Sequence, residues 1–485
     1  MKARALKENI LRKLGRVKEA EELHKESLKI DPLYDRQPEK INHNTLLELM
    51  IDLYEAGDYA QGIALAKKWV EQQNVSRQED IYPLVYYYIA YGYQNLHRKE
   101  NTKQTNHYMT AYVTLGENAV ADGCFPHRTE DYIVLKSLAD DYYLDMVYYY
   151  LGCLLYDRRA YGEAIADYEE AALRYPDFPT VHRNLALAYY NVKKQPQRAY
   201  EEMEKAFALD ETDARVYLEL DQLKKRMNIP VSERLEDMEK HFTLVESRDD
   251  LYLEYVTLLN TLGESEKALN LIKARKFHQW EGGEGKVAAQ YLTALYQLAK
   301  AAAAEGEYVE AKTILLQAVD EYPQNLGEGK LESAQENNLY YLLGLAQEKL
   351  GETEEAFASL TKACHGESEP VGMMYYNDQP PEMIYYQGLA YRKLGNEEQA
   401  VRRFRKLVEY GREHIEENVK IDYFAVSLPD LLIFEENLDE RNRKHCLFMM
   451  SLGLKGLGRS DEAEKCAEEL LAMDNAHQGI QVHDL

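Results

Sequence analysis

The stretch YYLGCLLYDRRAYGEAIADYEEAALRYPDFP, residues 149–179, decides the fold of this protein. It places large and small side chains in a fixed order: Leu151, Gly152, Tyr161, Ala164, Tyr168, Ala171 and Pro176. The small residues Gly152 and Ala164 allow two helices to approach closely, and Ala171 leaves room for a following helix. Pro176 ends the second helix because it has no backbone N–H to donate. The stretch therefore predicts a helical hairpin.

The same spacing recurs along the chain, which makes this hairpin one unit of a repeat. The other eight copies are marked by Gly15 with Pro32, Gly57 with Gly62, Leu185 with Asp210, Gly263 with Ala268, Gly306 with Pro323, Gly344 with Ala363, Gly388 with Phe404, and Gly458 with Ala463. Repeated hairpins bury their apolar faces on one another, so a chain of 485 residues needs no linker between globular cores.

Two stretches between the copies, residues 77–140 and 211–245, lack the full pattern but keep apolar residues at spacings of three and four. We expect them to form degenerate helical hairpins that continue the stack. No segment shows a sustained alternation of β-branched and polar residues, so little or no strand is expected.

This order of large and small positions resembles the tetratricopeptide repeat. The resemblance implies an all-α, right-handed superhelical solenoid of antiparallel helical hairpins, whose concave face holds a partner. We expect a single solenoid over residues 1–485. Its parts are N-terminal, more degenerate hairpins (1–140), central repeats (141–323), and C-terminal repeats (324–485) with an insertion near 411–441.

The composition narrows the classes of partner. A net charge of −26, from 84 acidic and 58 basic side chains, repels phosphate backbones and anionic lipids, so we expect neither nucleic acid nor membrane as a partner. The charge also serves solubility, or it attracts a basic partner. The five cysteines form no CxxC pair, and the N-terminus has no apolar signal segment. These features predict a protein of the reducing cytoplasm.

Catalytic motifs are not found. The segment Glu281-Gly-Gly-Glu-Gly285 lacks the Lys-Ser/Thr of a phosphate-binding loop, and no HExxH sequence occurs. His445 and Cys446 are adjacent, but neighbours on a helix point about 100° apart and do not share a metal ion. Pairs of carboxylates are expected by chance among so many acids. We therefore predict no enzyme, no catalytic residue, no metal site and no cofactor.

Four segments interrupt the repeat: residues 276–285, 323–338, 369–382 and 420–430. They mix aromatic residues with amides, carboxylates and glycines, a composition that suits recognition of polar ligands, although ordered loops that only pack the hairpins have it too. The residues that we predict to bind a ligand or partner are Trp280, Glu281, Tyr375, Tyr376, Asn377, Asp378, Tyr423 and Asp430.

A narrower resemblance rests on the motifs at residues 178–191, 277–286, 325–338, 373–395 and 420–446. They are similar to the helical-repeat region of large bacterial proteins of unknown function that carry an N-terminal mutarotase-like β-sandwich. The resemblance implies that such a domain precedes this chain. The first repeat begins without a polar capping helix, which also suggests that the chain is cut from a longer protein.

Two functions from different classes follow. The first is a non-catalytic scaffold that binds a protein segment, or its own N-terminal domain, on the concave face and the four interrupting segments. The alternative is an accessory part of a carbohydrate-binding or carbohydrate-active protein, in which the same aromatic and carboxylate residues contact a glycan.

Overall fold

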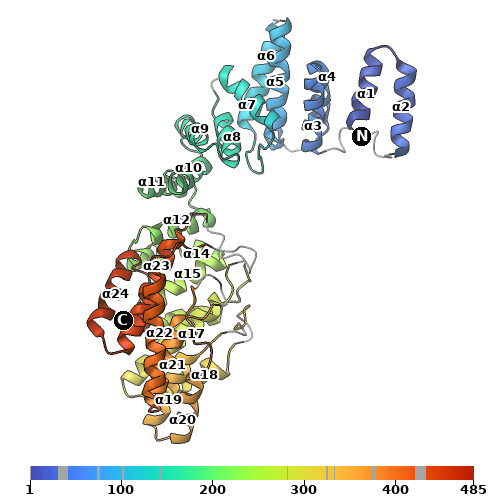
Figure 1. Ribbon diagram of the computed structural model, residues 1–485. Coiled ribbons are helices and arrows are strands. Elements are labelled where there is room, and N and C mark those ends of the chain that lie inside the picture. The colour runs from blue at the N-terminus through green and yellow to red at the C-terminus, as the bar shows by residue number, and fades with distance from the viewer. Residues whose placement is uncertain are drawn as a thin grey trace. The chain divides into compact units, whose positions relative to one another are not determined.

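The computed structural model describes residues 2–30, 42–73, 77–100, 103–141, 144–280, 282–323, 326–331, 334–372, 375, 378–420 and 433–485 (Figure 1). Within these residues the secondary structure consists of 25 α-helices and a short 3₁₀ helix, and no strand is formed. The predicted all-α fold is therefore confirmed. None of the described helices is both long and apolar enough to cross a membrane.

The helices divide into two compact units, Met1–Ala188 and Tyr189–Leu485, which we call unit 1 and unit 2. The single solenoid predicted for residues 1–485 stays a prediction. The helices of unit 1 are α1 (Lys2–Lys13), α2 (Val17–Ile30), α3 (His43–Glu55), α4 (Tyr59–Gln72), α5 (Pro83–Glu100), α6 (Lys103–Asn118), α7 (Thr129–Asp141), α8 (Met146–Asp157), α9 (Tyr161–Arg174) and most of α10 (Pro179–Asn191). Consecutive helices pack as hairpins, among them α1–α2, α3–α4, α5–α6 and α8–α9.

Unit 2 contains the remaining helices. They are α11 (Pro196–Leu209), α12 (Ala214–Arg226), α13 (Val231–Lys240), α14 (Phe242–Ser247), α15 (Asp249–Thr261), α16 (Ser265–Ala274), α17 (Lys286–Ala304), α18 (Tyr308–Asp320), α19 (Asn337–Lys349), α20 (Thr353–Ala363), α21 (Pro381–Lys393), α22 (Glu397–His414), α23 (Leu438–Gly456), α24 (Ser460–Met473) and α25 (Gln478–Val482). The segments 77–140 and 211–245, predicted to be degenerate hairpins, contain helices α5 to α7 and α12 to α14.

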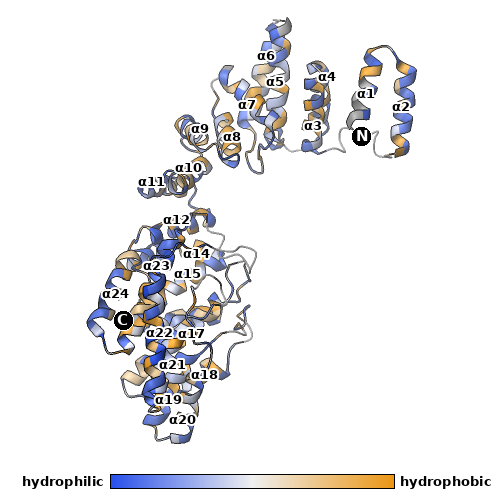
Figure 2. Ribbon diagram, viewed as in Figure 1, coloured by the Kyte–Doolittle hydropathy of each residue, from blue (hydrophilic) through white to orange (hydrophobic). Residues whose placement is uncertain are grey.

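The hairpins of unit 2 form two layers. The first helices of successive hairpins, α15, α17, α19, α21 and α23, contact one another in this order, and each also packs against its own second helix. Hydrophobic and hydrophilic residues are mixed along the helices in Figure 2, as expected for amphipathic helices that bury one face. The first helices thus make a continuous row along one side of the unit, which we call the inner row.

Small residues set the distance between paired helices. A Cβ atom on Gly152 would stand 2.5 Å from the ring of Tyr168, and one on Gly388 would stand 2.4 Å from the ring of Phe404. Both rings belong to the second helix of the same hairpin. Ala164 is fully buried at the same contact. The structure confirms that these positions allow the close approach predicted from residues 149–179.

The hairpin turns also follow the sequence. Gly351 and Gly395 lie two residues beyond the ends of α19 and α21, with φ values of +77° and +81°. Only glycine adopts this left-handed conformation without a steric penalty, and it ends a helix at this position. Helix α9 ends at Arg174, just before Pro176, as predicted.

A pair of glycine substitutions tests the close approach. Gly152→Ala should lower the free energy of unfolding by about 1–3 kcal/mol, because the added methyl group displaces the buried ring of Tyr168. The control is Gly162→Ala on α9, where a Cβ atom meets nothing within 4 Å. It should raise stability by about 0.5–1 kcal/mol through helix propensity alone. Urea denaturation followed by circular dichroism measures both, and equal shifts would contradict the role of Gly152.

Candidate functional site

Three of the eight residues predicted to bind a partner are described, and all three lie in unit 2: Trp280, Tyr375 and Asp378. The other five lie outside the described residues: Glu281, Tyr376, Asn377, Tyr423 and Asp430.

The described residues make local contacts. The carbonyl of Trp280 accepts a hydrogen bond of 3.0 Å from the N–H of Gly283, and a Cβ atom on Gly283 would stand 2.3 Å from the indole ring. Trp280 therefore packs on its own turn. The N–H of Tyr375 donates to Oδ2 of Asp378 at 3.0 Å, and the N–H of Asp378 donates to the carbonyl of Tyr375 at 3.1 Å. Tyr375 and Asp378 are thus brought together in one turn.

Two of the interrupting segments are joined to each other. The N–H of Phe277 donates to the carbonyl of Leu326 at 2.8 Å, which links segment 276–285 to segment 323–338. The carboxylate of Glu328 accepts hydrogen bonds from the N–H groups of Val287 and Ala288 at 3.0 and 3.1 Å. A carboxylate at the start of a helix satisfies amide groups that have no partner within the helix. Glu328 therefore caps α17.

A different part of unit 2 holds a polypeptide segment in a groove. Residues 474–485, which we call the α25 segment, follow α24 in sequence and lie against the inner row. Helix α25 packs on α15, more than 200 residues earlier in the chain. We call the surface that receives it, formed by α15, α17, α21 and α23, the unit 2 groove.

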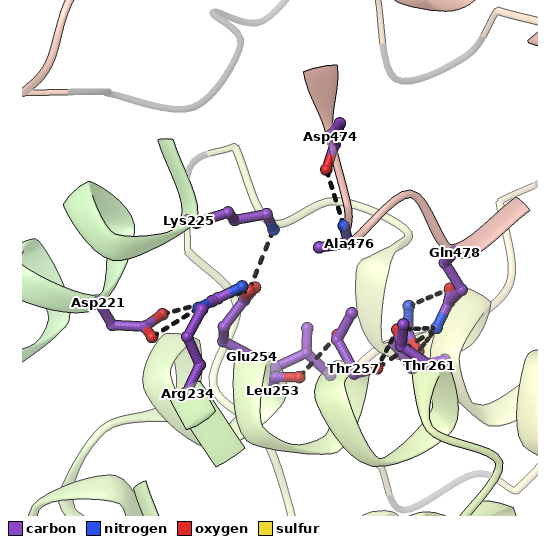
Figure 3. Close-up of polar contacts among 11 residues, drawn as sticks. Asp221, Lys225, Arg234, Leu253, Glu254, Thr257, Thr261, Asp474, Ala476 and Gln478 are labelled. Carbon is purple, nitrogen blue, oxygen red and sulfur yellow. Dashed lines mark hydrogen bonds and ion pairs between the residues drawn. The ribbon is translucent and has the colours of Figure 1, made fainter. Parts of the chain in front are cut away.

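Amide groups anchor the beginning of the α25 segment. The side-chain amides of Gln478 and Gln290 on α17 exchange two hydrogen bonds, at 3.1 and 3.2 Å. Nε2 of Gln478 also lies 3.4 Å from Oγ1 of Thr261 and 3.5 Å from the carbonyl of Thr257, both on α15 (Figure 3). A glutamine side chain both donates and accepts, so a single residue of the segment bonds to two helices.

Apolar and aromatic side chains bury the middle of the segment. Ile480 and Val482 are buried. A Cβ atom on Gly479 would stand 2.5 Å from Cζ of Phe448 on α23, and the ring of His477 lies 4.8 Å from the same phenylalanine. The segment therefore passes close to α23 at a residue that has no side chain.

The end of the segment meets tyrosines and lysines. Nδ1 of His483 lies 2.9 Å from the hydroxyl of Tyr386 on α21, which lies 2.6 Å from the hydroxyl of Tyr296 on α17. Nζ of Lys300 donates to the carbonyl of Val482 at 2.9 Å and contacts the carboxylate of Asp484 at 2.6 Å. Lys300 thus neutralises the carboxylate of Asp484 and binds one backbone carbonyl.

A second lysine approaches from α23. Nζ of Lys455 donates to the carbonyls of His483, at 3.3 Å, and of Asp484. Burial, assisted by the positive charge of Lys300, lowers the pKa of His483 to about 3. Burial also lowers the pKa of His477. Both imidazoles of the segment are therefore neutral at pH 7 while the segment is in the groove.

Two asparagines tie the base of the segment to the turn between α12 and α13. Oδ1 of Asn228 accepts a hydrogen bond from the N–H of Asn475 at 2.7 Å, and Nδ2 of Asn475 donates to the carbonyl of Asn228 at 2.7 Å. Nδ2 of Asn228 donates to the carbonyl of Ala472 at 3.2 Å. This contact fixes where the chain leaves α24 and enters the groove.

A buried ion network stands beside the groove. The guanidinium of Arg234 on α13 contacts Asp221 on α12 at 3.0 and 2.7 Å and Glu254 on α15 at 2.7 Å, and Lys225 lies 3.0 Å from Glu254 (Figure 3). Although burial opposes it, the positive charges of Lys225 and Arg234 lower the pKa of Glu254. The network locks α12 and α13 onto α15, the helix that bonds Gln478.

A cavity of about 790 Å³ lies near the base of the segment. Its lining residues are Tyr190, Lys194, Pro196, Arg226, Met227, Gly372, Glu435, Glu436, Asn437, Glu440, Arg441, Lys444, His445, Asp474 and His477. Lysines and carboxylates pair within it, Lys194 with Glu435 at 2.7 Å and Lys444 with Glu440 at 2.9 Å. Several of its charges are therefore paired with one another.

The interrupting segment 369–382 reaches this cavity, since Gly372 lines it and Val371 bonds to His445. Nε2 of His445 donates to the carbonyl of Val371 at 2.8 Å, and burial lowers the pKa of His445 to about 4. His445, which the sequence placed beside Cys446, is therefore a neutral side chain that holds this loop to α23. In the described residues no group of three or more His, Cys, Asp or Glu side chains is arranged to hold a metal ion.

Sequence reasoning did not identify the residues of the unit 2 groove: Gln290, Tyr296, Lys300, Tyr386, Lys455, Gln478 and His483. The groove residues belong to helices that the repeat pattern assigned to the scaffold. The one signal in the sequence was the pair Ile480 and Val482, apolar residues two apart beyond the last hairpin. What the groove offers chemically is hydrogen bonding and charge for a polypeptide backbone.

Comparison with known families identifies the repeat. Tetratricopeptide-repeat models match residues 149–214, 293–325, 338–364 and 382–410. These stretches contain five of the nine predicted copies, including the one at residues 149–179. The chain therefore contains tetratricopeptide repeats, and the copies near Gly15, Gly57, Gly263 and Gly458 stay predictions.

Similar solved structures are distant. Yeast Tom70 is 12% identical, covers 99% of this chain and 94% of its own, and has a TM-score of 0.32. The human IFIT1 dimer with m7Gppp-AAAA is 13% identical over 88% of each chain, with a TM-score of 0.28. A tetratricopeptide repeat protein from Parabacteroides merdae is 15% identical, covers 63% of this chain and 98% of its own, and has a TM-score of 0.21. We assign none of their ligands to this chain.

The ion network predicts a large difference between two similar substitutions. Arg234→Met should lower the free energy of unfolding by about 3–5 kcal/mol, because it leaves the buried Asp221 without its cation and Glu254 with Lys225 alone. Lys225→Met removes a lysine that is 44% exposed and should cost less than about 1 kcal/mol. Urea denaturation measures both free energies. Similar losses in the two variants would show that the network does not depend on Arg234.

The neutral histidines predict that the α25 segment is released by acid. A released His483 regains a pKa of about 6.5, so below that pH the imidazole of the released segment binds a proton. The groove-bound state is therefore fully stable above about pH 6.5 and loses about 1.4 kcal/mol per pH unit below it, until the bound pKa of about 3 is reached. Hydrogen exchange at pH 7.0 and 5.5, corrected for intrinsic rates, should show weaker protection of residues 480–485 at the lower pH.

The matched variant for this measurement is His483→Gln, which keeps a polar side chain but cannot titrate. It should remove the contribution of His483 and leave only that of His477. A wild-type protection that does not change with pH would contradict the expected release.

Proposed function

We propose that this chain is a non-catalytic interaction scaffold that binds a protein segment in the unit 2 groove. The observation that carries the proposal is that the groove holds a polypeptide segment by contacts suited to a ligand. Lys300 and Lys455 bond backbone carbonyls, which every peptide has, and Gln290 supplies a side-chain amide. The tetratricopeptide repeats support a protein partner, since this repeat typically serves protein–protein interaction.

The interrupting segments have a secondary part in this proposal. Phe277 joins two of the interrupting segments, and Glu328 caps α17. Both contacts help to hold the first helices in place. Such contacts support a role in shaping the groove. The partner residues predicted from sequence, from Trp280 to Asp430, remain candidates for contacts with a partner.

The more specific partners expected from the sequence, a β-sandwich domain and a carbohydrate, receive less support. The matched family models are those of the tetratricopeptide repeat, which lend no support to the β-sandwich that the resemblance implies. For the carbohydrate alternative, Trp280 is half-buried and part of its indole packs on Gly283, and the comparisons supply no carbohydrate ligand. We retain the cytoplasm as the proposed location, because the free cysteines suit a reducing compartment.

Selection of peptides from a random display library on the full chain tests this function. We expect selected peptides to bind saturably in calorimetry, and to lose at least tenfold in affinity with Lys300→Glu combined with Lys455→Glu. The control is Lys240→Glu combined with Lys205→Glu, which reverses two lysine charges on α13 and α11, away from the segment. The proposal is wrong if selected peptides bind the groove variant and the control variant equally.

A further inference from the structure

Helix α25 does not continue the repeat. It has 5 residues, whereas the first helices α15 and α23 have 13 and 19. A regular next hairpin would stack its first helix on α23 and α24, the last hairpin before it. Helix α25 touches Phe448 on α23 but also lies against α15 and α17, and His483, which follows it, reaches α21. The α25 segment therefore occupies the groove in the manner of a ligand, across several first helices.

Five side chains of the surface beneath the segment are polar. Gln290, Tyr296, Lys300, Tyr386 and Lys455 face it with amide, hydroxyl and ammonium groups. All of these groups are well solvated by water when the segment is absent. Ile480 and Val482 of the segment are buried, and the ring of Phe448 on α23 is the apolar part of the receiving surface, against Gly479 and His477. Removal of the segment thus exposes these polar groups together with Phe448.

We propose that the α25 segment is an intramolecular ligand that competes with the partner for the unit 2 groove. We also propose that the partner segment has the same pattern of side chains as the α25 segment. Both statements rest on the function proposed above. That chemistry is the pattern of Gln478-Gly-Ile-Gln-Val-His-Asp484. An amide residue bonds Gln290 and Thr261, apolar residues follow at the second and fourth positions after it, and an acidic residue meets Lys300.

The steps of recognition follow from these contacts. The amide sets the register, because it bonds α15 and α17 together. A small residue such as Gly479 must follow it, since a side chain there would collide with Phe448. The acidic residue is favoured because the groove presents two lysines, although the chain as a whole has a net charge of −26.

Competition from a segment of the same chain should strongly weaken the binding of a separate peptide. The segment is linked to α24 by a few residues, so its effective concentration at the groove is on the order of millimolar. A separate peptide of the same sequence therefore binds the wild-type chain weakly. When the chain's own segment has been expelled, the separate peptide binds with the intrinsic affinity of the groove.

The test uses the full chain and a fluorescent peptide of residues 474–485, followed by anisotropy. Ile480→Asp combined with Val482→Asp places two charges at buried positions and should expel the segment. We expect this variant to bind the peptide at least tenfold more tightly than the wild-type chain. Adding Lys300→Glu to this variant should abolish its gain in affinity for the peptide. The matched control is Val309→Asp with Phe357→Asp, which adds the same charges at positions that are 65% and 63% exposed, and it should behave like the wild type.

The proposal is overturned if the expelled variant keeps the wild-type circular dichroism and unfolding midpoint yet binds the peptide no better. If the variant fails to fold, hydrogen exchange on the wild-type chain decides. Exchange of residues 480–485 well before the amides of α15 and α17 supports a displaceable ligand, and exchange only with global unfolding overturns it.

The same chains separate this inference from the proposed function. Library peptides that bind the wild type and the expelled variant equally tightly leave the scaffold function intact and overturn the competition. If neither library peptides nor the labelled peptide bind any of these chains, the groove itself is not a binding site and both proposals fail.

Discussion

The close approach of the two helices in each hairpin is the constraint on which the rest of unit 2 depends. At the crossing points a Cβ atom would collide, with Phe404 if placed on Gly388 and with Leu360 if placed on Gly344. Because paired helices lie this close, the first helices of neighbouring hairpins contact one another and form a continuous row. That row gives the α25 segment a surface made from several helices at once.

The unit 2 groove and the buried ion network beside it use charge in opposite ways. In the ion network, Arg234 is fully buried and is paired with Asp221 and Glu254, so the charges hold three helices together. Within the groove, Lys300 and Lys455 point at backbone carbonyls and at Asp484. A strongly acidic chain thus presents a locally basic surface, since recognition depends on the groups within a few ångströms and not on the total charge.

The interrupting segments show why composition alone is a weak guide to binding sites. Asn, Asp, Glu and Gly suit polar ligands, but they also cap helices and close turns. Glu328 caps α17, and Asp378 closes a turn with Tyr375. The sequence could predict that these loops are special, whereas the choice between a ligand and a backbone N–H as the bonding partner depends on which helix end lies nearby.

The sequence by itself determined the all-helical fold, the hairpins and the positions of closest approach. These features depend on contacts between residues a few to some twenty positions apart, such as Gly152 with Tyr168, whose spacing can be read along the chain. Only the tertiary structure decided what lies in the groove. Gln478 meets Gln290 across 188 residues, and His483 meets Tyr386 across 97. No local pattern encodes such pairs, because they form only after the intervening hairpins have packed and brought α15, α17 and α21 to the same segment.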